Sequence, residues 1–88
     1  MKNQIEIDDF SNISHLSILM SLDGRLFFPI KHSNIIELEL LVKEITQKEP
    51  DSDNPSILGI RGELKMFGEV SPCTAEFNFE KNTGRINY

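Results

Sequence analysis

The fold is decided by residues 57–88, which read ILGIRGELKMFGEVSPCTAEFNFEKNTGRINY. From residue 57 to residue 70 apolar and charged side chains alternate, which is the period of a half-buried β-strand. We expect either one long strand bent at a glycine or two strands with a turn near Gly62, and a further turn at Ser71-Pro72. One face of this segment is predicted to be apolar and to carry Leu58, Ile60, Leu64, Met66 and Val70.

The end of the sequence predicts a β-hairpin whose loop comprises residues 81–84. Pairing Glu80 with Arg85 joins opposite charges across the two strands. The same register places Phe79 opposite Ile86, and such charged and apolar pairs stabilise neighbouring strands. An antiparallel hairpin is therefore expected at the C-terminus.

A helix is predicted from a cap at Ser33 or Asn34 to about Lys48 or Glu49, where Pro50 ends it. A glutamate three residues after Asn34 completes an approximate capping box. At 100° per residue, Ile36 and Leu40 fall on the outer side of this helix, away from the sheet. The stripe expected to pack on the sheet contains Ile35, Leu38, Leu41, Val42 and Ile45.

The dipeptide Asp23-Gly24 lies between two apolar runs, which predicts another hairpin. A three-residue loop at 22–24 pairs Met20 with Leu26 and collects the apolar side chains on one face. Pro29 cannot donate a hydrogen bond to a neighbouring strand, so we expect its strand to lie at an edge.

The N-terminal segment allows two interpretations. Ile5 and Ile7 alternate with polar residues, which predicts a short strand. Phe10, Ile13 and Leu16 instead have the spacing of a helical turn. The sequence leaves both interpretations open.

Together these elements predict a single α+β domain over residues 1–88. One helix packs on one antiparallel β-sheet in the order β-β-α-β-β-β, with or without an additional N-terminal strand, because this is the simplest two-layer solution. A β-grasp-like arrangement also begins with a hairpin followed by a helix. That similarity is one of topology only, since no sequence motif accompanies it.

The charge of the chain favours a basic partner. Its 88 residues carry a formal net charge of −5, which disfavours nucleic acid and anionic membrane as ligands. A single cysteine excludes an intramolecular disulfide and is typical of a reducing compartment. No apolar run approaches the ~20 residues of a membrane span, and residues 1–10 lack the features of a signal peptide. We therefore expect a cytoplasmic protein.

No residue pattern indicates catalysis, a cofactor or a metal. His15, His32 and Cys73 are scattered singly, whereas zinc ligands come in closely spaced sets. A calcium loop beginning at Asp51 would need glycine at its sixth position and glutamate at its twelfth, and neither is present. The sequence contains no nucleophile motif and no glycine-rich phosphate loop. The expectation is a protein that is not an enzyme.

The predicted function is therefore binding to another protein, as an inhibitor, immunity protein or antitoxin-like factor that masks a basic surface. The alternatives are a homodimeric structural or adaptor module and a small-ligand-binding domain around His15, Phe27 and His32. Leu19 and Phe27, on the outer side of the predicted hairpin, form a second candidate surface. The residues predicted to contact the partner are Ile36, Glu37, Leu40, Glu44, Glu49, Asp51 and Asp53.

Overall fold

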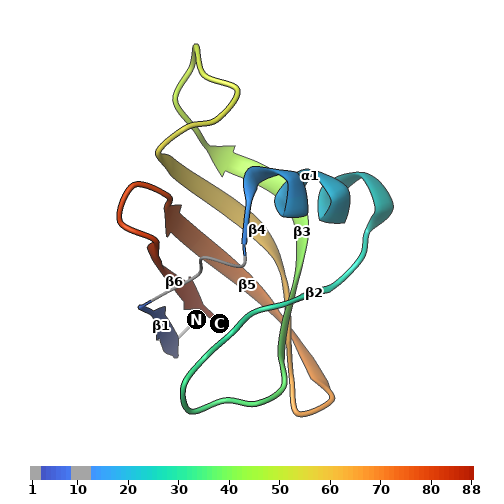
Figure 1. The fold of residues 1–88 in the computed structure, drawn as a ribbon. Helices are drawn as coiled ribbons and strands as arrows, with labels where there is room; N and C mark the ends of the chain where they lie inside the picture. Colours follow the sequence, from blue (N-terminus) through green and yellow to red (C-terminus); the bar gives the residue numbers. More distant parts are fainter. Residues whose placement is uncertain (1–2, 9–12) are drawn as a thin grey trace.

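The computed structural model describes residues 3–8 and 13–88, and in these residues it contains one helix and six strands. All the strand pairs are antiparallel, and the order across the single curled sheet is β1-β6-β5-β4-β3-β2. The short helix lies across one end of the sheet (Figure 1). The elements are β1 (Gln4–Ile7), α1 (His15–Gly24), β2 (Phe28–Pro29), β3 (Leu38–Gln47), β4 (Ile57–Met66), β5 (Glu69–Asn78) and β6 (Thr83–Asn87).

The predicted α+β class is confirmed, but the helix predicted after Asn34 is wrong because that segment contains strand β3. Leu38, Leu40 and Val42 alternate along β3 and are buried. A bulge between Val42 and Glu44 then shifts the register against β4. A bulge inserts an extra residue, so Val42 and Ile45, three positions apart, both contact the core. Leu41 is buried as well but lies outside the core cluster, and together these residues imitate the period of a helix.

The hairpin predicted around Asp23-Gly24 is also wrong, since this dipeptide ends α1. Arg25 follows in the left-handed conformation, with φ of 53°, and caps the helix. A residue in this conformation commonly ends a helix. Asp23-Gly24 therefore marks the end of a helix and not the turn of a β-hairpin. Pro29 does lie in β2, the last strand of the sheet, as its missing N–H predicts.

The turn in the glycine-containing segment lies at Phe67-Gly68, not at Gly62 or Ser71-Pro72. β4 continues without interruption through Gly62, and β5 continues through Ser71-Pro72. Met66 pairs with Glu69 across a two-residue turn. The inward-facing side chains are therefore even-numbered in β4 and odd-numbered in β5. Val70 therefore lies opposite Lys65, on the other face from the one predicted.

The C-terminal hairpin is confirmed, but its register differs by four residues from the predicted one. Arg85 pairs with Glu76 and Ile86 pairs with Ala75. The Asn78 side chain accepts hydrogen bonds from the backbone N–H groups of residues 80 and 81, and this begins the turn earlier than expected. An even shift leaves every side chain on its predicted face.

The N-terminal segment forms the strand β1, which pairs with β6. Asn3 and Tyr88 exchange two backbone hydrogen bonds of 3.0 Å, which places the two ends of the chain side by side. Of the alternative helical turn, Leu16 does lie in a helix, α1, and Ile13 precedes it. Phe10 lies outside the described residues.

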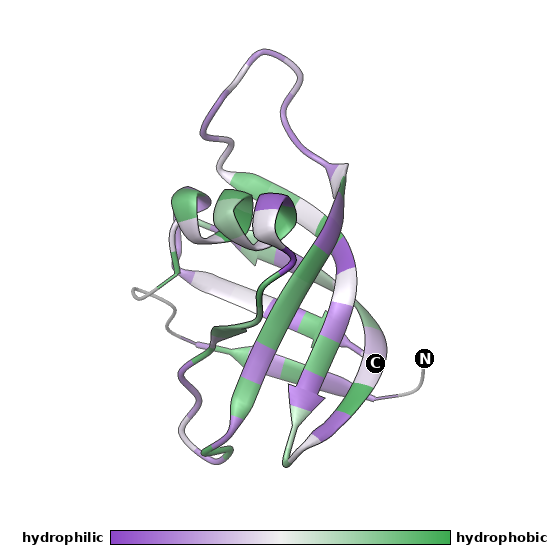
Figure 2. Ribbon diagram, turned by 90° about the vertical axis from the view of Figure 1, so that its right-hand side faces the viewer, coloured by the Kyte–Doolittle hydropathy of each residue, from purple (hydrophilic) through white to green (hydrophobic). Residues whose placement is uncertain are grey.

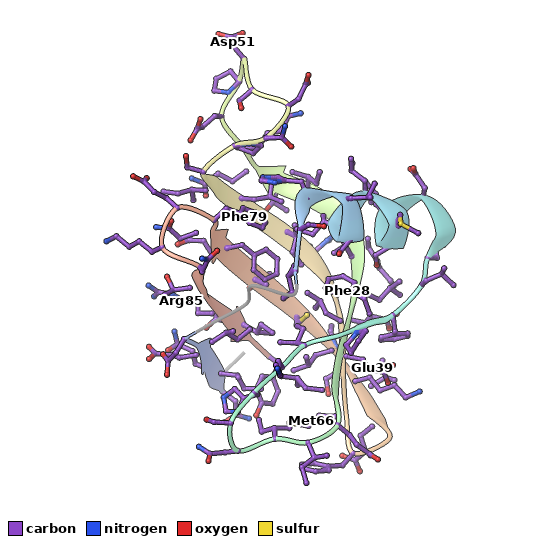
Figure 3. The ribbon with its side chains drawn as sticks, viewed as in Figure 1. Phe28, Glu39, Asp51, Met66, Phe79 and Arg85 are labelled. Carbon is purple, nitrogen blue, oxygen red and sulfur yellow. The ribbon has the colours of Figure 1, made fainter. Side chains whose placement is uncertain are left out.

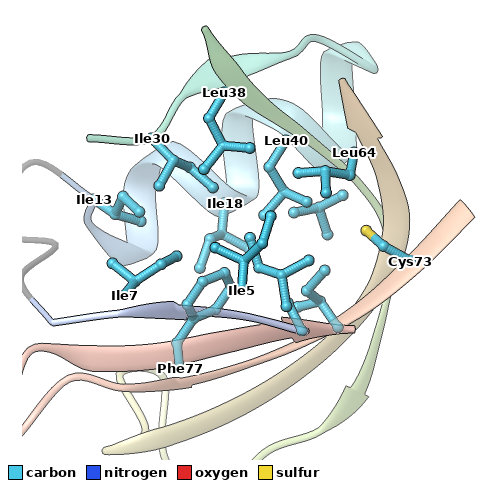
Figure 4. Packing of buried hydrophobic residues seen from close by; sticks show 14 of the residues in the cluster. Ile5, Ile7, Ile13, Ile18, Ile30, Leu38, Leu40, Leu64, Cys73 and Phe77 are labelled. Carbon is cyan, nitrogen blue, oxygen red and sulfur yellow. The ribbon is translucent and has the colours of Figure 1, made fainter. Parts of the chain in front are cut away.

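The core fills the inner face of the curled sheet (Figure 4). Charged residues occupy the outer face, where Glu39, Glu44 and Glu63 pair with lysine or arginine side chains across neighbouring strands. Exposed pairs of this kind contribute about 0–1 kcal/mol each, so apolar burial dominates stability. The most deeply buried large apolar side chains are Ile7, Ile18, Leu38, Leu40, Val42, Ile60, Leu64, Phe77 and Ile86.

Two loops mark opposite ends of the molecule, whose longest dimension is 37 Å. The β3–β4 loop, with Asp51 at its tip, extends from the end near α1, and Met66 lies beside the β4–β5 turn at the other end (Figure 3). The ten residues of β4 separate the two loops. Surfaces at these two ends are therefore independent of each other.

Candidate functional site

The residues predicted to bind a partner are distributed over separate parts of the molecule. Ile36 and Glu37 are exposed in the connection between β2 and β3. Glu44 lies on the outer face of the sheet, where its carboxylate is 3.0 Å from the Arg61 guanidinium. The remaining acidic residues are exposed in the β3–β4 loop, at the opposite end from Ile36: Glu49, Asp51 and Asp53.

Leu40 is buried in the core and is not available to a partner, so its predicted surface position is wrong. Its side chain has 0% exposure, and it pairs with Phe28 and Leu64 of the adjacent strands. The prediction placed Leu40 outside because it assumed a helix. On a strand, residues two apart share a face, and Leu40 therefore follows Leu38 inward.

Helix α1 is held at both ends by its own polar groups. The Ser14 hydroxyl accepts the backbone N–H of Ser17 at 3.2 Å, and the Ser17 hydroxyl accepts the N–H of Ser14. At the other end, the N–H groups of Arg25 and Leu26 donate to the Ser21 carbonyl. The serine pair resembles a capping box with serine in place of glutamate. That pattern, before an apolar run that does not alternate, is the sequence signal for α1.

An ordinary surface helix buries its apolar side and exposes its polar side, whereas α1 carries apolar side chains on both sides: Ile18 is buried and Leu22 packs against the core. Ser21 faces the sheet beside Ile18 and is 2% exposed. Leu16, Leu19 and Met20 face solvent with exposures of 64%, 46% and 58%. The side of α1 that points away from the protein is therefore apolar.

Leu26 extends this apolar surface beyond the end of the helix. It is 60% exposed. A Cβ atom at Gly24 would lie 3.3 Å from the Leu26 side chain, and Gly24 is one helical turn beyond Met20. We call the surface made by Leu16, Leu19, Met20 and Leu26 the outer face of α1.

Ser21 faces inward because it hydrogen-bonds the part of β3 beyond Leu40, which β2 does not pair with. Its hydroxyl accepts the backbone N–H of Val42 at 3.0 Å and donates to the Leu26 carbonyl. An edge strand otherwise presents unpaired backbone groups to solvent. The hydroxyl therefore fixes both the rotation of α1 about its axis and the direction in which the outer face of α1 points.

The acidic β3–β4 loop borders this apolar face. His15 Nε2 lies 2.9 Å from the Pro55 carbonyl oxygen, and the His15 ring packs on Phe79 with centroids 4.0 Å apart. A narrow cavity of about 50 Å³ between the helix and the loop is lined by both Leu19 and Asp53. Figure 2 shows the hydrophilic loop beside the more apolar helix. Lys48 lines the same cavity, so apolar side chains and charges of both signs form one continuous surface.

A second group of exposed apolar side chains lies at the other end of the molecule. Ile36, Phe67 and Val70 are 94%, 65% and 49% exposed. A shallow depression of about 390 Å³ is lined by Pro29, Ile36 and Phe67 together with the charged residues Glu37, Glu39 and Lys65. Of the residues predicted to contact a partner, Ile36 and Glu37 lie at this end of the molecule.

The potential reactive side chains lie apart from one another. His15 is held against Pro55, whereas the Nδ1 atom of His32 accepts the backbone N–H of Asn34 at 3.0 Å. Phe27, the third residue of the predicted ligand site, lies under the Lys65 ammonium group. The structure therefore does not bring His15, Phe27 and His32 together.

The Cys73 thiol is buried, and burial together with the nearby Glu63 carboxylate raises its pKa to about 11. A thiol in this state is a poor nucleophile, because the thiolate is the reactive form. Within residues 3–8 and 13–88, no group of three or more His, Cys, Asp or Glu side chains is arranged to hold a metal ion.

Among the described residues, no helix has the length and apolar character that crossing a membrane requires. Comparison of the chain with protein-family models, with curated proteins and with solved structures found no match. The interpretation of the outer face of α1 therefore depends on its own geometry and charge.

Proposed function

We propose that this protein binds another protein through the outer face of α1, as an inhibitor, immunity protein or antitoxin-like factor that masks a surface of its target. The observation that carries the proposal is the exposed apolar side of α1: Leu16, Leu19 and Met20 face solvent, although the same helix already buries Ile18 in the core. A helix that is apolar on its exposed side is characteristic of one that packs against a further partner.

The charges beside this face indicate the chemistry of the partner. The border of this face carries Asp51 and Asp53 in the loop that adjoins Leu19 and Asp23 in the last turn of α1. These three carboxylates outnumber the two basic residues beside them, Lys48 and Arg25. An apolar centre with a charged rim is the usual arrangement of a protein interface. We expect the target to present an apolar groove bordered by lysine or arginine, because complementary charge accelerates association and sets orientation.

The proposed role is non-enzymatic. In the described part of the chain, the histidines are engaged with backbone groups and the cysteine is buried. Catalysis by a side-chain nucleophile needs that nucleophile, a base and an orienting group within hydrogen-bond reach of one another. Apolar contact and charge complementarity are sufficient for inhibition by steric masking.

Affinity capture with matched variants tests the proposal. The immobilised wild-type chain and the Leu16→Asp/Met20→Glu variant are exposed to the same cell extract, and the retained proteins are quantified. Both acidic substitutions are compatible with the helix, Leu16→Asp because it lies in the first turn. We expect a protein that the wild type retains and the variant loses by ~10-fold or more, since central apolar anchors dominate interface energies.

The charged border is tested with Asp51→Lys/Asp53→Lys, for which we expect weaker retention of the same protein and a smaller effect of added salt. Ile36→Asp and Glu37→Lys are the matched controls, because they make the same kinds of change at the opposite end of the molecule. If every retained protein binds all these variants as well as the wild type, the proposal is rejected. Circular dichroism establishes that each variant is folded.

A further inference from the structure

The acidic β3–β4 loop is longer than an ordinary hairpin connection. It comprises residues 48–56, whereas hairpin loops usually have about 2–5 residues. Its base is closed by the Glu49 carboxylate, which accepts the backbone N–H of Ser56 at 3.2 Å. Asp51 at its tip and Asp53 beyond the tip are exposed (Figure 3). A loop of this length needs a contact outside itself to keep one position, because ordering each residue costs conformational entropy.

His15, in the first turn of α1, supplies such a contact. Its Nε2 atom lies 2.9 Å from the Pro55 carbonyl oxygen. A carbonyl oxygen can only accept a hydrogen bond, so Nε2 carries the proton and donates it. Within residues 3–8 and 13–88, no other hydrogen bond joins α1 to the loop.

The His15 side chain is also held by Phe79, which follows β5. The centroids of the two rings are 4.0 Å apart. The backbone N–H of Phe79 in turn donates to the Ser56 carbonyl at 2.7 Å, and Pro55 is buried. The start of α1, the end of the loop and the end of β5 therefore meet at one point, which we call the His15 joint.

Away from the His15 joint, the loop and the helix are not closely packed. A cavity of about 50 Å³ remains between them, and its lining includes Leu19, Lys48 and Asp53. This volume is sufficient for about one or two water molecules. The position of the loop beside α1 therefore depends chiefly on the His15 joint.

We propose that His15 locks the acidic loop to α1, so that Asp53 keeps a fixed position beside Leu19. The loop and the outer face of α1 then meet a target as one preformed surface. Such a surface loses less conformational freedom on binding, which increases affinity. This use of the lock rests on the proposed function, whereas the lock itself is a property of the free protein.

Backbone dynamics of the purified full chain, measured by NMR, test the lock. His15→Phe keeps a ring on Phe79 but has no N–H for Pro55. His15→Ala removes both contacts and preserves the helix, because alanine is the best helix former. In His15→Ala we expect the amide order parameters of residues 51–54 to fall from ~0.85 to below ~0.6, the values of rigid and flexible backbone. The Ser56 amide should exchange with solvent ~10-fold faster, and His15→Phe should lie between wild type and His15→Ala.

His32→Ala is the matched control. The Nδ1 atom of His32 also engages a backbone group, the N–H of Asn34, but it does so in the connection between β2 and β3. This variant should leave the loop as ordered as in the wild type, and the amides of β4 should keep their protection in every variant. A loop that is equally ordered in the wild type and in His15→Ala overturns the proposal. Equal loosening of the loop in His32→Ala overturns it too, because the effect is then not specific to the His15 joint.

Affinity capture with the same variants separates the lock from the proposed function. A protein that is retained through the outer face of α1 should bind His15→Ala ~3- to 10-fold more weakly, since the loop must then be ordered on binding. Its retention by His32→Ala should be unchanged. Undiminished retention by His15→Ala with a mobile loop would refute the role of the lock in binding. If the wild type retains no protein through this face, the proposed function fails, and the order parameters by themselves still decide whether the lock exists.

Discussion

The backbone N–H of Val42 donates a hydrogen bond of 3.0 Å to the hydroxyl oxygen of Ser21. This bond joins the middle of strand β3 to the middle of α1 and is buried on both sides. It explains why a polar residue occupies the inner side of a helix whose outer side is apolar. The backbone N–H of Val42 needs a hydrogen-bond acceptor, which the Ser21 hydroxyl supplies and a leucine side chain could not.

Replacing Ser21 with alanine is expected to lower the free energy of unfolding by about 1–3 kcal/mol, because the buried N–H of Val42 loses its acceptor. Urea denaturation followed by circular dichroism measures this. Ser33→Ala is the control, since Ser33 is exposed, and it should change stability by less than about 0.5 kcal/mol. Equal effects of the two substitutions would contradict the role assigned to Ser21.

The core position of Leu40 predicts that Leu40→Ala destabilises the protein by about 2–5 kcal/mol, from lost burial and the cavity left behind. Leu40→Asp should not fold, because it places a charge without a partner in the core. Leu16→Asp makes the same chemical change on the outer face of α1 and should fold. The far-ultraviolet circular dichroism spectrum distinguishes these outcomes, and a folded Leu40→Asp would refute the assignment of β3.

Gly62 allows β3 and β4 to approach each other at the bulge. A Cβ atom at this position would lie 1.8 Å from the Leu41 carbonyl oxygen, which belongs to the backbone and cannot move aside. Gly62→Ala is therefore expected to cost about 3 kcal/mol, the upper end of the usual cost of overpacking. The stability is read from the urea midpoint of unfolding.

Gly68→Ala is the matched comparison for Gly62. Nothing lies within 4 Å of a Cβ atom at Gly68, but its φ is 82°. Its cost should be about 1–2 kcal/mol, from the backbone conformation alone. A smaller loss for Gly62→Ala than for Gly68→Ala would show that the close approach at the bulge is not rigid.

The Cys73 thiol makes stability depend on pH. Its pKa rises from 9.0 to about 11 on folding, because burial disfavours the thiolate. The folded state therefore binds the proton more tightly, and this contribution to stability is present below pH 9 and is lost as pH rises toward 11. Urea titrations between pH 8 and pH 11 should show this decline, and the decline should be smaller in Cys73→Ala.

The sequence predicted the strands that carry a clear alternation. Leu58, Ile60 and Leu64 are buried, as their spacing in β4 indicates. The alternation of Ile5 and Ile7 likewise corresponds to β1, and Pro29 lies in the edge strand β2. Because successive side chains on a strand point to opposite faces, apolar residues at every second position show which face is buried, whatever the order of the strands in the sheet.

The position of the helix was not predictable from the spacing of apolar residues. The apolar residues of β3 follow a helical spacing because Leu41 is buried outside the core cluster and because the bulge after Val42 brings Ile45 back to the core. The residues of α1 follow neither period, because Ser21 is buried and Leu16 is exposed. Both patterns reflect contacts with distant residues, so tertiary packing overrides local propensity in each case.

By itself, the sequence determined the α+β class, an antiparallel sheet and a formal net charge of −5, but not which segment forms the helix. Only the tertiary structure decided that Ile36 remains exposed while Leu40 is buried, and that the main apolar surface belongs to α1. The physical reason is that side-chain exposure depends on what packs against each face. The hydrogen bond between Val42 and Ser21, which orients that face, joins residues 21 positions apart.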